Sequence, residues 1–135
     1  MNKTVEVTFA GGKKLDAKID GMTVRTDQPA DKGGEGTAPN PFQLFLAALA
    51  ACAGFYALEF CQSRDIGTEG MSLKMECEFD AEDKLYKRMN IELTLPKGFP
   101  PKYQEAIVRA VNNCTVKKHI INAPIFKITT VFEPD

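Results

Sequence analysis

Apolar and polar residues alternate in three short stretches at the start of the chain. In each stretch the apolar residues fall on one face, which is the pattern of a half-buried strand. Gly11-Gly12 and Asp20-Gly21 separate the stretches, and both pairs are typical of tight hairpin turns. The pattern therefore predicts a three-stranded antiparallel meander. Its expected strands are 3–9, 13–19 and 22–26.

A long apolar run over residues 40–64 follows the meander. Asn40 is a favoured N-cap residue and Pro41 suits the first helical position, so the run predicts one long helix. Apolar residues occur on nearly all sides of this helix, and we expect it to be buried. Gln43 and Glu59 interrupt the run, which favours the core helix of a soluble protein over a membrane span.

The long helix carries two cysteines, Cys52 and Cys61, that point in opposite directions at 100° per residue. Bulky groups share the side of Cys52, whereas small residues share the side of Cys61 and permit close packing of another backbone. The Cys52 side holds Phe45, Ala48, Leu49, Phe55, Tyr56 and Glu59. The Cys61 side holds Gln43, Ala47, Ala50, Gly54 and Ala57.

The second half of the chain alternates again and then becomes helical. Cys77 falls among the inward residues of a predicted hairpin, where a cysteine acts as a small core residue. The order of elements predicts a single α+β domain over residues 1–135, with an antiparallel sheet packed on the long central helix. The further expected segments are strands over 71–79 and 86–96, helices over 100–114 and from 114 or 115, and a C-terminal strand over 125–133.

Composition narrows the function. The formal net charge of −1 and the lack of a basic cluster argue against nucleic acid or a membrane surface as partner. The N-terminal stretch has no apolar secretory core, so we expect a cytoplasmic protein. Its four cysteines form no C-x-x-C pair and are expected to be free thiols. His119 is the one histidine, and we expect neither a metal nor a cofactor.

Two cysteines are candidates for chemistry. Cys52 reads from composition alone as a core residue, and a low pKa there would need a nearby cation. Cys114 follows two asparagines at a helix junction, and in the first turn of the short helix its thiolate would be favoured. The Gly- and Pro-rich segment 28–39 is either a connector or a flap over the Cys52 site. The candidate cations are Arg25, Lys13, Lys14, Lys117 and Lys118.

Two sequence segments indicate that Cys52 has a functional role. The run GTAPNPFQLFLAALAAC ends at Cys52, and NNCTVKKHI contains Cys114 about sixty residues later. Together they resemble the OsmC/Ohr family of thiol-dependent peroxidases, in its shorter and less characterised OsmC-like branch. The resemblance implies an intertwined homodimer with sites at the subunit interface. It also implies that Cys52 attacks an organic hydroperoxide, that Cys114 resolves the sulfenic acid as a disulfide, and that an external dithiol reduces it.

One position departs from the family pattern. Family peroxidases carry a glutamate directly after the N-P of the motif, where it partners an activating arginine, and this chain has Phe42 there. Glu35 and Glu59 are the candidate acids to replace it, and Arg25 is the arginine that precedes Cys52. A thiol peroxidase for apolar hydroperoxides is the leading hypothesis, because the two cysteines match the family and the surroundings of Cys52 are aromatic. The alternatives are a non-enzymatic module that binds an apolar ligand and a thiol redox sensor.

Overall fold

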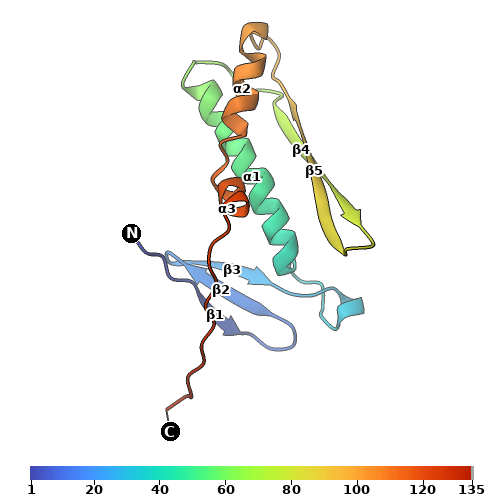
Figure 1. Cartoon of the computed structure of the whole chain (residues 1–135), viewed down its shortest axis with the longest axis vertical. Helices are drawn as coiled ribbons and strands as arrows, with labels where there is room; N and C mark the ends of the chain where they lie inside the picture. Colours follow the sequence, from blue (N-terminus) through green and yellow to red (C-terminus); the bar gives the residue numbers. More distant parts are fainter. Residues whose placement is uncertain (135) are drawn as a thin grey trace. The chain divides into compact units, whose positions relative to one another are not determined.

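The computed structural model describes residues 1–134, and Figure 1 traces the elements along the chain. The chain contacts define two compact units, Met1–Ala48 and a second unit that begins at Leu49. The boundary falls inside the long helix α1, Pro41–Gln62.

The first unit contains the predicted meander. The strands pair antiparallel in the order β1-β2-β3, and Ala17 on β2 lies opposite both Val7 and Val24. The shared apolar face is therefore as predicted, but its expected burial is wrong, since Phe9 is 87% exposed and Met22 is 62% exposed. The strands are β1 (Glu6–Phe9), β2 (Leu15–Ile19) and β3 (Met22–Thr26), and the 3-10 turn η1 (Ala30–Lys32) follows them.

Helix α1 begins with the predicted cap. The Gln43 N–H donates to the Asn40 Oδ1 at 2.8 Å, and the Asn40 N–H donates to the Gln43 Oε1 at 2.9 Å. This reciprocal capping box satisfies two backbone donors at the helix start, and Pro41 supplies the first helical residue without an N–H.

The burial of α1 differs from the expectation. The prediction of a helix buried nearly all round is wrong, because burial is confined to one stripe and Phe42, Phe45 and Phe55 are exposed. The segments of the second unit that pack on α1 cover this stripe, and Phe55 on another side of the helix stays 53% exposed. By length and composition α1 could also cross a membrane, a property shared by core helices of soluble proteins. The buried residues are Leu49, Ala53, Ala57, Phe60 and Cys61.

The second unit contains the predicted hairpin of β4 (Ser72–Asp80) and β5 (Leu85–Thr94). Cys77 lies opposite Met89 on the same face, and both side chains are half-buried. A bulge between Glu78 and Phe79 shifts the register near the turn.

The core of the second unit lies between the end of α1 and the helix α2 (Gln104–Val111), which the 3-10 turn η2 (Pro101–Tyr103) precedes. The ring of Phe60 meets that of Tyr103 edge-on at 5.9 Å. Residues of the hairpin and of α2 pack around this centre. The buried cluster consists of Ala57, Phe60, Cys61, Phe99 and Ile107.

The chain then forms the short helix α3, Thr115–Ile121. The predicted strand over 125–133 is wrong, because residues 123–134 are extended without strand pairing. Ile128 is 92% exposed and Phe132 is fully exposed. A strand needs a neighbour that supplies hydrogen-bonding groups, and none of the other described segments pairs with this one.

Candidate functional site

Cys52 and Cys114 are brought together in the second unit. Cys52 lies in α1 and is half-buried, and its sulfur accepts a hydrogen bond from the Cys114 thiol. Cys114 is 2% exposed. All four cysteines of the chain are free thiols. The two cysteines selected from the sequence are therefore neighbours in the reduced protein.

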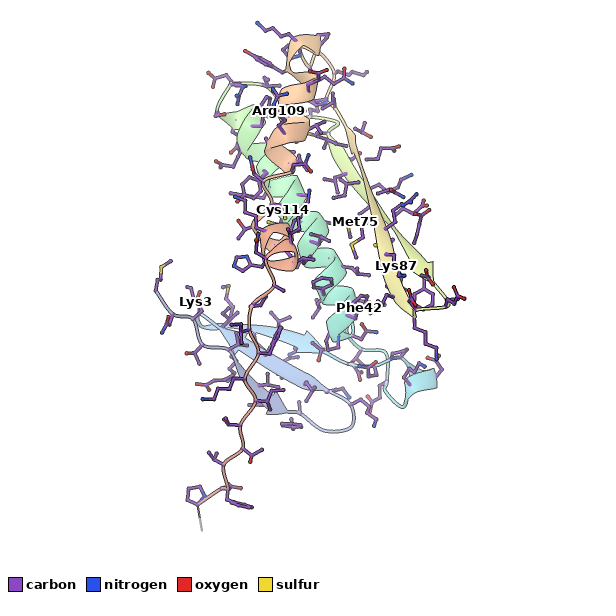
Figure 2. All side chains as sticks on the ribbon, viewed as in Figure 1. Lys3, Phe42, Met75, Lys87, Arg109 and Cys114 are labelled. Atoms are coloured by element: carbon purple, nitrogen blue, oxygen red, sulfur yellow. The ribbon has the colours of Figure 1, made fainter. Side chains whose placement is uncertain are left out.

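The position of Cys114 follows from the way α2 ends. The Asn113 N–H donates to the Ala110 carbonyl at 3.1 Å, and the Cys114 N–H donates to the Val111 carbonyl at 3.2 Å. These turns end α2 and make Cys114 the N-cap residue of α3. Figure 2 labels Cys114 between the two helices. The predicted helix junction at Cys114 is confirmed.

The pKa of Cys52 is lowered by its hydrogen bonds. Burial opposes ionisation and by itself raises the pKa of this thiol. The Val116 N–H, the Cys114 thiol and the Thr115 N–H donate hydrogen bonds to its sulfur, and together they bring the pKa below its usual value. The expectation that a low pKa there needs a cation is wrong, since hydrogen-bond donors from the start of α3 lower it.

The pKa of Cys114 moves in the opposite direction. Burial raises it, and both the hydrogen bond to Cys52 and a negative charge on Cys52 raise it further. Hydrogen bonds from the Lys117 and Val116 N–H groups reduce the shift without reversing it. The N–H groups of the short helix therefore favour the Cys114 thiolate as expected, but burial and the neighbouring Cys52 outweigh them and the net pKa is raised. N–H groups of α3 donate to both sulfurs, and only at Cys52 do the hydrogen bonds outweigh burial, so Cys114 is the member of the pair that keeps its proton more firmly.

The donor groups of Thr115 and Val116 could not be found from residue types, because they belong to the backbone. A helix start after Cys114 was the available signal, and it placed two unpaired N–H groups directly after that residue. Only the packing of α3 on α1 directs those groups at Cys52.

Three of the candidate cations lie opposite or bind other residues of their own unit. Arg25 lies on β3 opposite Asp16, on the face away from the apolar residues of the meander. Lys14 forms an ion pair with Glu35 at 2.9 Å, which raises the pKa of Lys14 through the hydrogen bond between them. Lys117 donates to the Asn112 Oδ1 at 2.8 Å. An activating role for Arg25 stays a prediction.

The segment after β3 is ordered by a buried carboxylate that the sequence did not single out. Asp27 is 1% exposed, and its carboxylate accepts hydrogen bonds from the Gln28 N–H at 2.7 Å and the Thr37 hydroxyl at 2.7 Å. These bonds, the Thr37 hydroxyl first, lower the pKa of Asp27 to about 2. At Gly34 a Cβ would lie 1.9 Å from the Gln28 carbonyl oxygen, so glycine is required there.

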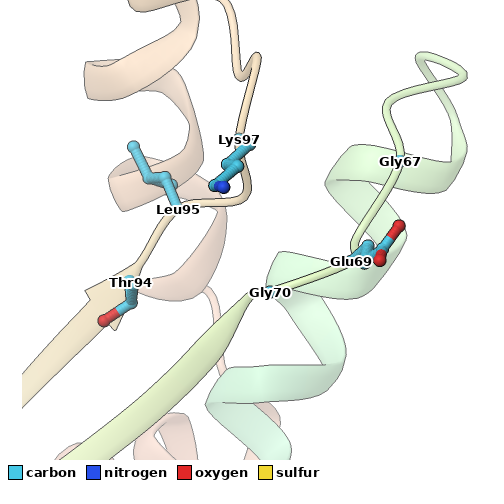
Figure 3. Close-up of a pocket in the computed structure, with 6 residues that line it drawn as sticks. All are labelled: Gly67, Glu69, Gly70, Thr94, Leu95 and Lys97. Atoms are coloured by element: carbon cyan, nitrogen blue, oxygen red, sulfur yellow. The ribbon is translucent and has the colours of Figure 1, made fainter.

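The described residues 1–134 contain no group of three or more potential metal-ligating acids, cysteines or histidines. A pocket of about 600 Å³ opens in the second unit between the end of β5 and the segment before β4 (Figure 3). Its lining holds Glu69 and Lys97 and no thiol, so it is separate from the cysteine pair. The lining residues are Gly67, Glu69, Gly70, Thr94, Leu95 and Lys97.

Comparisons with known proteins agree with this architecture. The family model described as OsmC-like protein matches residues 34–129. A solved structure from Psychrobacter arcticus 273-4, of a protein named for osmotic stress and detoxification responses, has a TM-score of 0.72 at 23% identity and covers 85% of each chain. No curated protein matches the chain.

Two other solved structures have the same fold. The organic hydroperoxide resistance protein OsmC from Legionella pneumophila has a TM-score of 0.57 at 24% identity, with 89% of each chain covered. The OsmC-like protein from Mycoplasma pneumoniae has a TM-score of 0.67 at 14% identity, with 91% of this chain and 89% of that chain covered. At these identities the likeness establishes the fold.

Proposed function

Because this chain belongs to the OsmC-like protein family, we propose that it is a thiol-dependent peroxidase that reduces organic hydroperoxides. The observation that carries the proposal is the hydrogen-bonded pair of Cys52 and Cys114, in which the pKa of Cys52 is lowered and that of Cys114 is raised. A thiolate beside a protonated thiol is the arrangement that a peroxidatic cysteine and a resolving cysteine need.

The first proposed step oxidises Cys52. Its thiolate attacks the outer oxygen of the hydroperoxide, an S–O bond forms, and the O–O bond breaks. The alkoxide leaves with the electron pair of that bond and takes a proton from solvent, which gives an alcohol. Cys52 is then a sulfenic acid, and the peroxide has been reduced by two electrons.

The second proposed step uses Cys114. Its sulfur attacks the sulfur of the Cys52 sulfenic acid, an S–S bond forms, and the hydroxyl leaves with the Cys114 proton as water. An external dithiol then reduces the disulfide by two exchange steps and becomes a disulfide itself. The chain needs no cofactor in this cycle. Free thiols that must be regenerated favour the reducing cytoplasm as its location.

The family glutamate position holds Phe42 in this chain, so activation needs another explanation. The N–H donors of Thr115 and Val116 support the proposal because they stabilise a thiolate without a charged pair. Arg25 remains a candidate for a further contribution. Turnover by Arg25→Lys and Arg25→Ala, compared with the wild type, measures that contribution directly.

The experiment follows the loss of cumene hydroperoxide and of hydrogen peroxide with dithiothreitol as reductant. We expect the wild type to consume the organic peroxide faster than hydrogen peroxide, and Cys52→Ser to show no turnover. In Cys114→Ser, Cys52 should be oxidised once to a sulfenic acid that dimedone traps. Cys77→Ser is the matched control and keeps its turnover, because Cys77 lies on β4 and is not among the groups that interact with Cys52 or Cys114. Wild-type turnover no faster than that of Cys52→Ser would reject the proposal.

We also propose that the functional form is a homodimer. Apolar side chains of α1, of the meander and of the C-terminal segment lack cover in the single chain, and large exposed apolar surfaces mark interaction sites. Light scattering after size exclusion is expected to give twice the mass of one chain. Phe132→Asp weakens the dimer and the neighbouring Glu133→Gln does not. A wild-type monomer at micromolar concentration contradicts the proposal.

Binding of an apolar ligand without turnover is the second candidate function. Phe42 and Phe45 form an exposed ring pair with centroids 5.6 Å apart, and Phe42 replaces the family acid. Mass spectrometry of gently purified Cys52→Ser should then show a retained apolar ligand.

A redox sensor would form the Cys52–Cys114 disulfide after one equivalent of peroxide but turn over slowly. Formation of the disulfide removes two hydrogens from the chain. If the intact mass does not fall by two hydrogens after peroxide treatment, both the sensor and the peroxidase are rejected.

A further inference from the structure

A hydrogen bond between two hydroxyl groups ties α1 to α3 beside the cysteine pair. The Tyr56 hydroxyl lies 2.7 Å from the Thr115 Oγ1. Tyr56 follows Cys52 by four positions, so the two residues lie one turn apart on the same side of α1. Thr115 is the first residue of α3 and directly follows Cys114. The hydrogen bond therefore joins the two segments that carry the two thiols.

The short helix needs such a tie. A helix of seven residues has little stability of its own, so contacts with the rest of the unit must hold it in place. The hydrogen bonds that its N-cap residue Cys114 accepts from the Val116 and Lys117 N–H groups lie within the first turn and do not reach α1. The hydrogen bond from Lys117 to Asn112 joins α3 to the preceding turn and does not reach α1. Tyr56 supplies a polar contact from α1 itself.

We propose that Tyr56 is a positioning residue for the cysteine pair: its hydroxyl, through Thr115, holds the first turn of α3 against α1. In that position the Thr115 and Val116 N–H groups donate to the Cys52 sulfur, and the Cys114 thiol stays within hydrogen-bond reach. Tyr56 acts through Thr115 and does not itself enter the chemistry. This inference deepens the proposed function. The expected effect of Tyr56 on peroxide turnover rests on that function, whereas its expected effect on the pKa of Cys52 does not.

The thiol itself provides the test. Iodoacetamide alkylates the thiolate, so the rate of Cys52 alkylation against pH, followed by peptide mass spectrometry of the full chain, gives its apparent pKa. Among the described residues, the Cys114 thiol is the titratable group that interacts with Cys52. We expect Tyr56→Phe to raise the midpoint and to slow alkylation at neutral pH about threefold, the size of one hydrogen bond.

Variants of the partner make the test specific. Thr115→Val removes the other hydroxyl and should have the same effect, and Thr115→Ser should restore the wild-type midpoint. The double variant should match either single variant, because both remove the same hydrogen bond. Tyr103→Phe is the matched control, since it removes a hydroxyl from a tyrosine whose ring contacts Phe60 in the core.

The results separate this inference from the proposed function. A midpoint that stays at the wild-type value in both Tyr56→Phe and Thr115→Val, whatever the change in melting temperature, overturns the positioning role. If Tyr56→Phe does not fold, Thr115→Val and Thr115→Ser decide the matter. A raised midpoint in a protein without peroxide turnover supports the positioning role and rejects the peroxidase. Normal peroxide turnover with an unchanged midpoint supports the peroxidase and rejects the positioning role.

Discussion

Helix α1 carries two cysteines whose thiols have opposite chemical tendencies. Cys52 is half-buried, and backbone N–H groups of α3 and the Cys114 thiol lower its pKa against the effect of burial. Cys61 is fully buried in the core cluster, and burial raises its pKa although the positive charge of Arg64 opposes that shift. The side chain and the helix are the same in both cases. The difference lies in what the neighbouring segment presents, hydrogen-bond donors at one site and apolar groups at the other.

The largest expected effect is a difference in reactivity between these two thiols in the folded wild type. Cys52 should react with iodoacetamide at pH 7.5 at least about 100-fold faster than Cys61, because Cys61 must first be exposed by opening of the core. Peptide mass spectrometry of quenched samples measures both rates together. In concentrated guanidinium chloride the two rates should become similar. Equal rates in the folded protein would remove the basis of the comparison.

Cys61→Ser tests whether Cys61 is a packing residue. A hydroxyl without a partner in the apolar core should lower the free energy of unfolding by about 1–3 kcal/mol, measured by urea denaturation. The half-buried Cys77→Ser should cost less. The pH midpoint of Cys52 alkylation should stay unchanged in both variants. A shifted midpoint in Cys61→Ser would show that the two sites are coupled.

Cys114→Ala sharpens the other side of the comparison. It removes a hydrogen-bond donor from the Cys52 sulfur, so the pKa of Cys52 should rise and its thiolate fraction at neutral pH should fall. Alkylation of Cys52 at pH 7 should slow about fivefold. Cys114→Ser, which keeps a donor, should slow it less. Faster alkylation or a lower pKa in the alanine variant would contradict the assigned hydrogen bond.

The smallest expected effect concerns acid stability of the first unit. The pKa of Asp27 is lowered to about 2 in the folded protein, so the unfolded chain binds its proton first as pH falls. The contribution of Asp27 to stability should be complete above about pH 4 and decline towards pH 2. Denaturant unfolding at several pH values should show this decline in the wild type and in Asp31→Asn. Asp27→Asn should lack it, and an equal decline there would contradict the assignment.

Much of the fold could be predicted because local signals were strong. Period-two alternation fixed the three strands of the meander and the β4–β5 hairpin, and Asn40 with Pro41 fixed the start of α1. The C-terminal strand failed for a physical reason. Alternation in residues 125–133 records a preference for an extended backbone, but a strand forms only where another segment supplies its hydrogen bonds.

The site was predictable in part. The positions of Cys52 and Cys114 in two motifs identified both thiols, and the structure places them in hydrogen-bond contact. The source of the lowered pKa was not predictable, because a helix start after Cys114 does not indicate that its backbone N–H groups face the sulfur of Cys52. The Tyr56–Thr115 hydrogen bond joins residues 59 positions apart, and neither residue indicates the other.

The sequence by itself determined most of the elements, the family and the two cysteines, because each depends on residue type and spacing along the chain. The tertiary structure decided which cysteine is favoured as a thiolate. That choice depends on which segment packs against each sulfur, and the short helix α3 packs its first turn against Cys52. Cys61, on the same helix, meets the aromatic core instead. The environment that favours the thiolate at one cysteine and disfavours it at the other exists only after the chain has folded.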